Sequence, residues 1–165
     1  MKTIKIPKTL VDEVRAFSKK AVANSKHYKQ KFLIGNEDRN QFLGYMLEFA
    51  ACWHWKQPYP KILKIGQVDL YDLKLNGLTF DVKASKGCHV NVKQFDKNKA
   101  DAYLFGQTRL LDYDSGLLFA DFFGWIEAER LLRISELVEH PNGSRSYKVS
   151  RKSLNKMNLL INGGI

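Results

Sequence analysis

The segment from Leu70 to Ala84, LYDLKLNGLTFDVKA, constrains the fold of this chain most strongly. At its centre is Asn76-Gly77, a dipeptide that favours a type I′ turn because both central residues of that turn require positive φ. Apolar and polar residues alternate on both sides of the turn, as in strands with one buried face. The segment therefore predicts a β-hairpin.

The two-residue turn fixes the register of this hairpin, because residues equidistant from the turn face each other. Asp72 therefore faces Asp81, and Lys83 lies on the same face, two residues further along. Two carboxylates directly opposite each other repel, and a divalent cation with a neighbouring ammonium would reverse that repulsion. The other face carries only apolar residues and is predicted to be core: Leu73, Leu75, Leu78, Phe80 and Val82.

Length and composition describe one folded domain. The chain has 165 residues, of which 44% are hydrophobic and 12% aromatic, so residues 1–165 can form a single domain with a sizeable core. No segment resembles a signal peptide or a membrane span, and we expect a cytoplasmic protein without membrane contact. Cys52 and Cys88 lack metal-site spacing and are predicted to be reduced thiols.

The charge balance favours a polyanionic partner. Lysine and arginine number 27 against 17 aspartates and glutamates, which gives a formal net charge of +10. Nucleic acid is the first such partner to consider for a chain this basic.

Two helices are expected before the hairpin. Thr9 is a plausible N-cap for a helix over 10–25, with Asp12 and Glu13 in its first turn. A second helix is expected from about Asn36 to Trp55, with an apolar surface that includes Trp53. Glu48 interrupts that surface, and Gly44 lies one turn earlier, where a glycine indicates close packing or access.

The segments around and after the hairpin predict a mixed sheet flanked by helices, an α/β (α+β) class fold. Residues 61–65 read as a strand, 93–99 as a helix, and 102–105 and 117–123 as buried strands. Residues 127–133 predict a helix, 147–149 a last strand, and a final helix through about residue 160 follows Ser150. Met1–Ile6 is an edge strand or a loose start, and Trp125 is expected in the core.

Oxygen ligands from two or three carboxylates suit Mg²⁺, with Mn²⁺ as a substitute, and such ions accept phosphate oxygens as further ligands. A lysine beside them can orient or deprotonate an attacking water. Asp72, Asp81 and Glu48 are therefore candidate metal ligands, and Lys83 a candidate catalytic residue.

These features together resemble the PD-(D/E)XK nuclease superfamily. The matching segments are GYMLE ending at Glu48, YDLKLNGLTFDVKAS over 71–85, ADAYLFG over 100–106 and FFGWIEAERL over 122–131. The resemblance implies a restriction-endonuclease-like core and Mg²⁺-dependent hydrolysis of DNA, more in the manner of an endonuclease. In it Asp72 and Asp81 hold the metal, Glu48 assists directly or through water, and Lys83 acts on the nucleophile. Cleavage of two strands by one site per chain would favour a homodimer.

Several alternatives stay open. A bulge in the hairpin would bring Asp69 into the place of Asp72 as the first acid. Lys86, His89, Lys93 and Gln94 are candidate nucleic-acid contacts, whereas His54 is expected to be packed or on the surface. A catalytically inactive nucleic-acid-binding domain of the same fold, or an RNA-directed nuclease, would share these features, and a structural subunit would share the charge.

Overall fold

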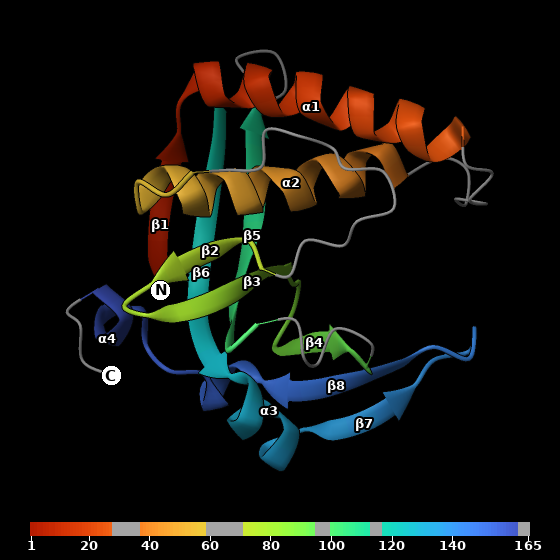
Figure 1. Ribbon diagram of the computed structural model, residues 1–165, viewed down its shortest axis with the longest axis vertical. Coiled ribbons are helices and arrows are strands. Elements are labelled where there is room, and N and C mark those ends of the chain that lie inside the picture. The colour runs from red at the N-terminus through yellow and green to blue at the C-terminus, as the bar shows by residue number, and fades with distance from the viewer. Residues whose placement is uncertain (28–36, 59–70, 95–99, 113–116, 162–165) are drawn as a thin grey trace.

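The computed structural model describes residues 1–27, 37–58, 71–94, 100–112 and 117–161. The predicted strand over 61–65 and most of the predicted helix over 93–99 lie outside these ranges. The described chain is a mixed α+β structure with two sheets, as the sequence predicts at this level (Figure 1). Among these residues no helix is long and apolar enough to cross a membrane.

The larger sheet has five strands in the order β1-β6-β5-β3-β2. Of the strand pairs that the structure describes in this sheet, β3–β5 alone is parallel, so the sheet is mixed. The predicted edge strand at the N-terminus is confirmed as β1. The strands are β1 (Lys2–Ile6), β2 (Leu73–Leu75), β3 (Leu78–Ala84), β5 (Ala102–Asp112) and β6 (Leu117–Glu127).

The β2–β3 hairpin has the predicted register, with Leu73 opposite Phe80 and Leu75 opposite Leu78. Asn76 and Gly77 have φ values of 49° and 84°, as a type I′ turn requires. The Asn76 side chain also donates a 2.9 Å hydrogen bond to the carbonyl of Leu160. This bond ties the turn to the last helix of the chain.

Helices α1 (Lys8–His27) and α2 (Glu37–His54) cover one face of this sheet (Figure 1). The prediction of Thr9 as N-cap was wrong, because α1 begins one residue earlier. The N–H of Val11 already donates to the carbonyl of Pro7, so Thr9 lies inside the first turn. Asp12 and Glu13 consequently fall outside the first turn, which has no acidic residue.

The core between helices and sheet contains the predicted apolar face of the hairpin. Leu73, Phe80 and Val82 are buried against the middle of α2, where Met46 and Leu47 are fully buried. The prediction of Trp53 as part of this surface was wrong, since its side chain is 43% exposed.

Gly44 of α2 does not serve close packing against the described residues. A Cβ atom built there would have no neighbour within 4 Å in that part of the chain. Of the two roles predicted for Gly44, access is therefore the one still open.

A second core lies on the opposite face of the sheet, where a three-stranded sheet and α3 cover it. This sheet has the order β4-β8-β7 and consists of β4 (His89–Lys93), β7 (Glu136–Glu139) and β8 (Arg145–Ser150); α3 spans Ala128–Ile134. The prediction of a helix beginning at Lys93 was wrong for that residue, which is the last of β4. Strand β7 has no counterpart in the prediction, and strand β8 contains the predicted residues 147–149.

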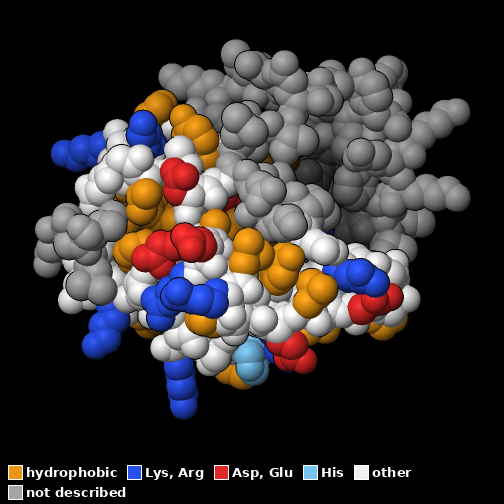
Figure 2. All heavy atoms as spheres, turned by 60° about the horizontal axis from the view of Figure 1, so that its bottom comes forward, with side chains coloured by type: hydrophobic (Ala, Val, Ile, Leu, Met, Phe, Trp, Pro, Cys, Tyr) orange, Lys and Arg blue, Asp and Glu red, His pale blue; other side chains and the backbone are white. Residues whose placement is uncertain are grey.

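The described part of the chain ends with a short 3₁₀ turn (Arg151–Ser153) and α4 (Met157–Ile161). Ser150 caps the 3₁₀ turn, accepting a hydrogen bond from the N–H of Lys152, so the single final helix predicted here is two short pieces. Three large apolar side chains in and after α3 are exposed, namely Leu132, Ile134 and Leu137. Figure 2 brings this end of the molecule forward and shows hydrophobic side chains among basic and acidic ones.

One buried charge holds β1 to the sheet. Asp121 of β6 is 2% exposed and accepts hydrogen bonds from Thr3 of β1 and from Arg109 and Gln107 of β5. Burial alone would raise the pKa of Asp121, but the hydrogen bonds from Arg109, Thr3 and Gln107, with the charge of Arg109, outweigh it and lower that pKa.

Candidate active site

The candidate acids lie where β3 leaves its hairpin partner. Strand β2 pairs only with residues Leu78–Phe80, whereas β3 continues to Ala84 and pairs with β5 along its other edge. From Asp81 onward, the outer edge of β3 therefore has no strand partner among the described residues. Such an edge offers main-chain N–H groups to side chains or ligands.

Asp81 and Lys83 point to the face of the sheet that carries the second core. Their neighbours on β5 are Tyr103 and Phe105, both buried in that core. The Lys83 ammonium lies 2.8 Å from Oδ2 of Asp81. This Oδ2 atom is buried, and its partner in the ion pair is the half-buried ammonium of Lys83.

Asp72 lies at a bend just before β2 and is bonded twice to β3. Its main-chain N–H donates to the carbonyl of Phe80 at 2.8 Å, and its Oδ2 atom accepts a 2.6 Å hydrogen bond from the N–H of Val82. These bonds bring its carboxyl group into contact with that of Asp81. The structure thus brings together three of the four predicted catalytic residues, Asp72, Asp81 and Lys83.

The electrostatics of Asp72 follow from this crowding. Burial, and then the charge of Asp81, raise the pKa of Asp72 to about 7, although the Val82 N–H and the Lys83 charge act in the opposite direction. At neutral pH the Asp72 carboxyl group is therefore protonated in roughly half of the molecules. A divalent cation at this position would displace the proton of Asp72 and take oxygen ligands from both carboxylates, so the two acids fit a hard metal ion.

Glu48 comes from α2, on the opposite side of the sheet from the Asp81 and Lys83 side chains. It lies one helical turn before Cys52, whose thiol is 3.5 Å from the main-chain carbonyl of Asp72. Burial, followed by the charges of Asp72 and Glu48, raises the pKa of Cys52 to about 12. Both acids are therefore close enough to Cys52 for their charges to act on one thiol.

The three acids do not form a single compact ligand group. In the part of the chain that the structure describes, no three His, Cys, Asp or Glu side chains lie close enough together to hold one ion. Asp69, the alternative first acid, lies outside the described residues.

The predicted nucleic-acid contacts lie after β3. Lys86 is exposed in the turn that follows the strand, His89 and Lys93 are exposed at the two ends of β4, and Gln94 is half-buried beyond it. Strand β4 alternates exposed and buried residues, so Asn91 shares the exposed face with His89 and Lys93. The sequence reasoning did not single out Asn91, although the same alternation predicts its position.

Arg151 is a second residue that the sequence reasoning missed, because it was assigned to a final basic helix. Its guanidinium donates to the carbonyl of Ser85 at 3.1 Å and lies 3.4 Å from the ring centre of Phe123. Its main-chain N–H donates to the carbonyl of Cys88. Arg151 thereby fixes the turn that contains Lys86 beside the candidate site.

Comparison of the chain with protein-family models, with curated proteins and with solved structures gave no significant match.

Proposed function

We propose that this protein is a Mg²⁺-dependent deoxyribonuclease that hydrolyses phosphodiester bonds in DNA as an endonuclease. The observation that carries the proposal is the contact between the Asp72 and Asp81 carboxyl groups, with Lys83 paired to Asp81, on the open edge of β3. A pair of crowded acids beside a lysine, on a chain of net charge +10, matches the chemistry of metal-assisted phosphate hydrolysis.

A bound cation would stabilise the ionised forms of Asp72 and Asp81, whereas each of these carboxylates destabilises the other. Without a cation, Asp72 and Asp81 can both be ionised only against burial and their mutual repulsion, and these two causes together raise the pKa of Asp72. Asp72 and Asp81 would hold the Mg²⁺ or Mn²⁺ ion, and Glu48 would assist through a water from the α2 side. The bound ion would polarise the phosphoryl group and neutralise the negative charge that develops on it.

The remaining residues would place the substrate and the attacking water. Lys83 stays fixed by its ion pair with Asp81 and can orient or deprotonate that water. Lys86, His89 and Lys93 are exposed on the segment that follows and can contact phosphates, with Gln94 beyond them. Such contacts make affinity fall steeply with salt concentration.

The restriction-endonuclease-like core is part of the same proposal. Its support is the order of elements: a helix bearing Glu48, then the hairpin with Asp72 and Asp81, then a strand, β5, parallel to β3. The homodimer expected for cleavage of two strands stays a prediction.

The decisive experiment compares Asp81→Asn and Lys83→Met with the unaltered protein on supercoiled plasmid, in Mg²⁺ and in Mn²⁺. We expect both variants to lose cleavage by about 100-fold or more, since a single acid–base group contributes about that factor. Asp121→Asn is the matched control, because Asp121 is another buried, cation-paired aspartate on the same sheet. It should keep the cleavage activity.

The outcomes also distinguish this function from the alternative functions. Unchanged cleavage by both variants would contradict the assignment of the site. Salt-dependent binding of DNA by the unaltered protein without any cleavage would favour a non-cleaving nucleic-acid-binding domain. Cleavage confined to an RNA substrate would favour an RNA-directed nuclease.

A further inference from the structure

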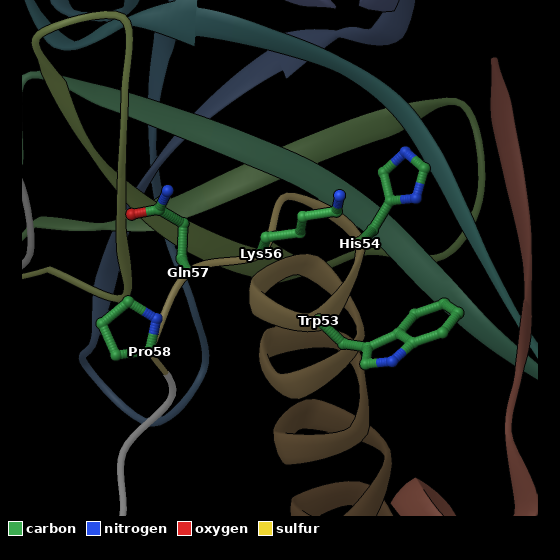
Figure 3. A pocket seen from close by; sticks show the side chains of 5 residues that line it. All are labelled: Trp53, His54, Lys56, Gln57 and Pro58. Carbon is green, nitrogen blue, oxygen red and sulfur yellow. The ribbon is translucent and has the colours of Figure 1, made fainter.

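A pocket of about 580 Å³ opens at the C-terminal end of α2, apart from the two acids. Its described lining consists of five consecutive or nearly consecutive residues, shown in Figure 3: Trp53, His54, Lys56, Gln57 and Pro58. The lining combines an aromatic ring, a lysine, an imidazole and an amide, and none of its described residues is acidic.

The way in which α2 ends creates this pocket. After His54 the chain makes one tight turn, in which the N–H of Gln57 donates to the carbonyl of Cys52 at 2.8 Å. Lys56 has a φ of 54°, a left-handed conformation that turns the chain away from the helix axis. Trp55 packs inward with its ring 5.3 Å from that of Phe122, and this anchor leaves Trp53 on the outside.

The side chains that line the pocket can make different kinds of contact with a ligand. Trp53 is 43% exposed and presents a stacking surface. Figure 3 shows the Lys56 side chain extending towards the His54 ring, while Gln57 and Pro58 lie at the other side of the turn. Burial, and then the charge of Lys2, lower the pKa of His54, so this imidazole is neutral at pH 7 and has one donor and one acceptor.

We propose that this pocket binds an unpaired nucleotide of a single-stranded DNA segment, with the base stacked on Trp53 and a phosphate against Lys56. Aromatic stacking and positive charge are the two elements that non-specific recognition of single strands combines. His54, towards which the Lys56 side chain extends, can meet the edge of the base. The inference rests on the proposed function, because it specifies which DNA that function would act on.

The location of the pocket connects this binding to the candidate active site. Cys52, the residue before Trp53, contacts the main-chain carbonyl of Asp72 through its thiol. The same turn of α2 therefore lies against the first acid and carries the stacking residue. A strand held at Trp53 would therefore lie close to the main chain of Asp72, so the substrate expected for this site contains a single-stranded portion near the cleaved bond.

The test measures binding of the protein to a fluorescein-labelled oligothymidylate of about ten nucleotides and to a blunt duplex. EDTA is present, so that no cleavage occurs. We expect Trp53→Ala to weaken oligothymidylate binding about 10-fold, since loss of one base–aromatic stack has roughly that effect, and to leave duplex binding unchanged. Lys56→Ala should weaken it about 3-fold at low salt. Lys20→Ala is the matched control, because it removes an exposed lysine from the second half of α1.

Tryptophan fluorescence supplies a second measurement. Trp125 is buried and Trp55 is half-buried, so quenching by the unlabelled oligonucleotide should come from Trp53 and vanish in Trp53→Ala. Equal binding by the variant, or equal quenching by polyglutamate, would overturn the proposal. Because these measurements are made without metal, such a result would not contradict the proposed nuclease activity. Conversely, the cleavage activity of Asp81→Asn does not test binding at the pocket.

Discussion

The Oδ2 atom of Asp72 accepts a 2.6 Å hydrogen bond from the main-chain N–H of Val82, the residue that stands between Asp81 and Lys83. This bond satisfies an N–H on the open edge of β3, where no described strand pairs with it. It also fixes the Asp72 carboxyl beside that of Asp81. The backbone of β3 thus holds the Asp72 side chain in the rotamer that places the two acids together.

The raised pKa of Asp72 predicts how stability changes with pH in the absence of metal. Its folded pKa, about 7, exceeds the ordinary value of 3.8, so the native state holds a proton that the unfolded chain has already lost between these values. The free energy of unfolding should therefore fall as pH rises from about 4 to about 7. Asp72→Asn cannot ionise and should be more stable than the unaltered protein at pH 8 by roughly 1–3 kcal/mol, since one pKa unit corresponds to about 1.4 kcal/mol.

Urea unfolding of both proteins in EDTA, at pH 5 and at pH 8, checks this prediction. The quantity of interest is the difference between the two proteins at each pH, because groups that do not interact with Asp72 titrate equally in both. A difference that stays constant from pH 5 to pH 8 would contradict the assignment of the raised pKa to Asp72.

Metal binding should offset the loss of folding stability that the ionised Asp72 and Asp81 pair causes. At a concentration 100 times the dissociation constant, Mn²⁺ should stabilise the native state by about 2.7 kcal/mol and raise Tm by about 5–10 °C. Differential scanning calorimetry at pH 7.5 measures this shift. Asp81→Asn should abolish it, whereas Asp121→Asn should retain it; an equal shift in Asp81→Asn would place the metal elsewhere.

The hairpin could be predicted to the level of individual residue pairs, because a two-residue turn at Asn76-Gly77 leaves one register that buries Leu73 and Phe80 together. The contact between Asp72 and Asp81 follows from the same register. The bond from the Val82 N–H could not be predicted, since it depends on where β2 stops and β3 continues. The contact between the Cys52 thiol and the main-chain carbonyl of Asp72 depends on how α2 packs on the sheet. The spacing of residues along the chain does not contain that information.

The errors have local physical causes. Thr9 looked like an N-cap, but the carbonyl of Pro7 already accepts the first helical hydrogen bond. Strand β7 was missed because only four residues form it, and its pattern of exposed residues has no clear alternation. Lys93 was assigned to a helix from its polar surroundings, whereas pairing with Ser146 of β8 makes it a strand residue.

The two cysteines should differ sharply in reactivity. Cys88 is exposed, whereas Cys52 is fully buried and its pKa is raised to about 12 by burial and by the charges of Asp72 and Glu48. Because the thiolate is the reactive form, a disulfide reagent such as DTNB at pH 8 should modify one thiol per native chain and two after denaturation. Cys88→Ser should leave no fast-reacting thiol in the native protein, and rapid modification of that variant would contradict the burial of Cys52.

Two glycines should respond oppositely to alanine. At Gly44 a Cβ atom meets nothing within 4 Å among the described residues, so Gly44→Ala in the middle of α2 should raise stability by about 1 kcal/mol. At Gly106 the same atom would lie 2.7 Å from the main-chain carbonyl oxygen of Asp121, so Gly106→Ala should cost about 2 kcal/mol. Thermal unfolding of both variants measures the two effects. A loss of stability in Gly44→Ala would show that close packing, and not access, accounts for this glycine.

Asp72 and Asp69 can be distinguished as the first acid by parallel substitution. In the observed hairpin register, Asp72 lies against Asp81, and it is held there by the N–H groups and carbonyls of β3. Asp72→Asn should therefore reduce Mg²⁺-dependent DNA cleavage by about 100-fold or more, while Asp69→Asn should retain most of it. Both variants keep the size of the side chain, and cleavage rates on the same plasmid, with far-UV circular dichroism to check folding, compare them directly. Loss of cleavage in Asp69→Asn with activity retained in Asp72→Asn would mean that the chain before β2 adopts a different register in the complex with substrate, and would move the first metal ligand to Asp69.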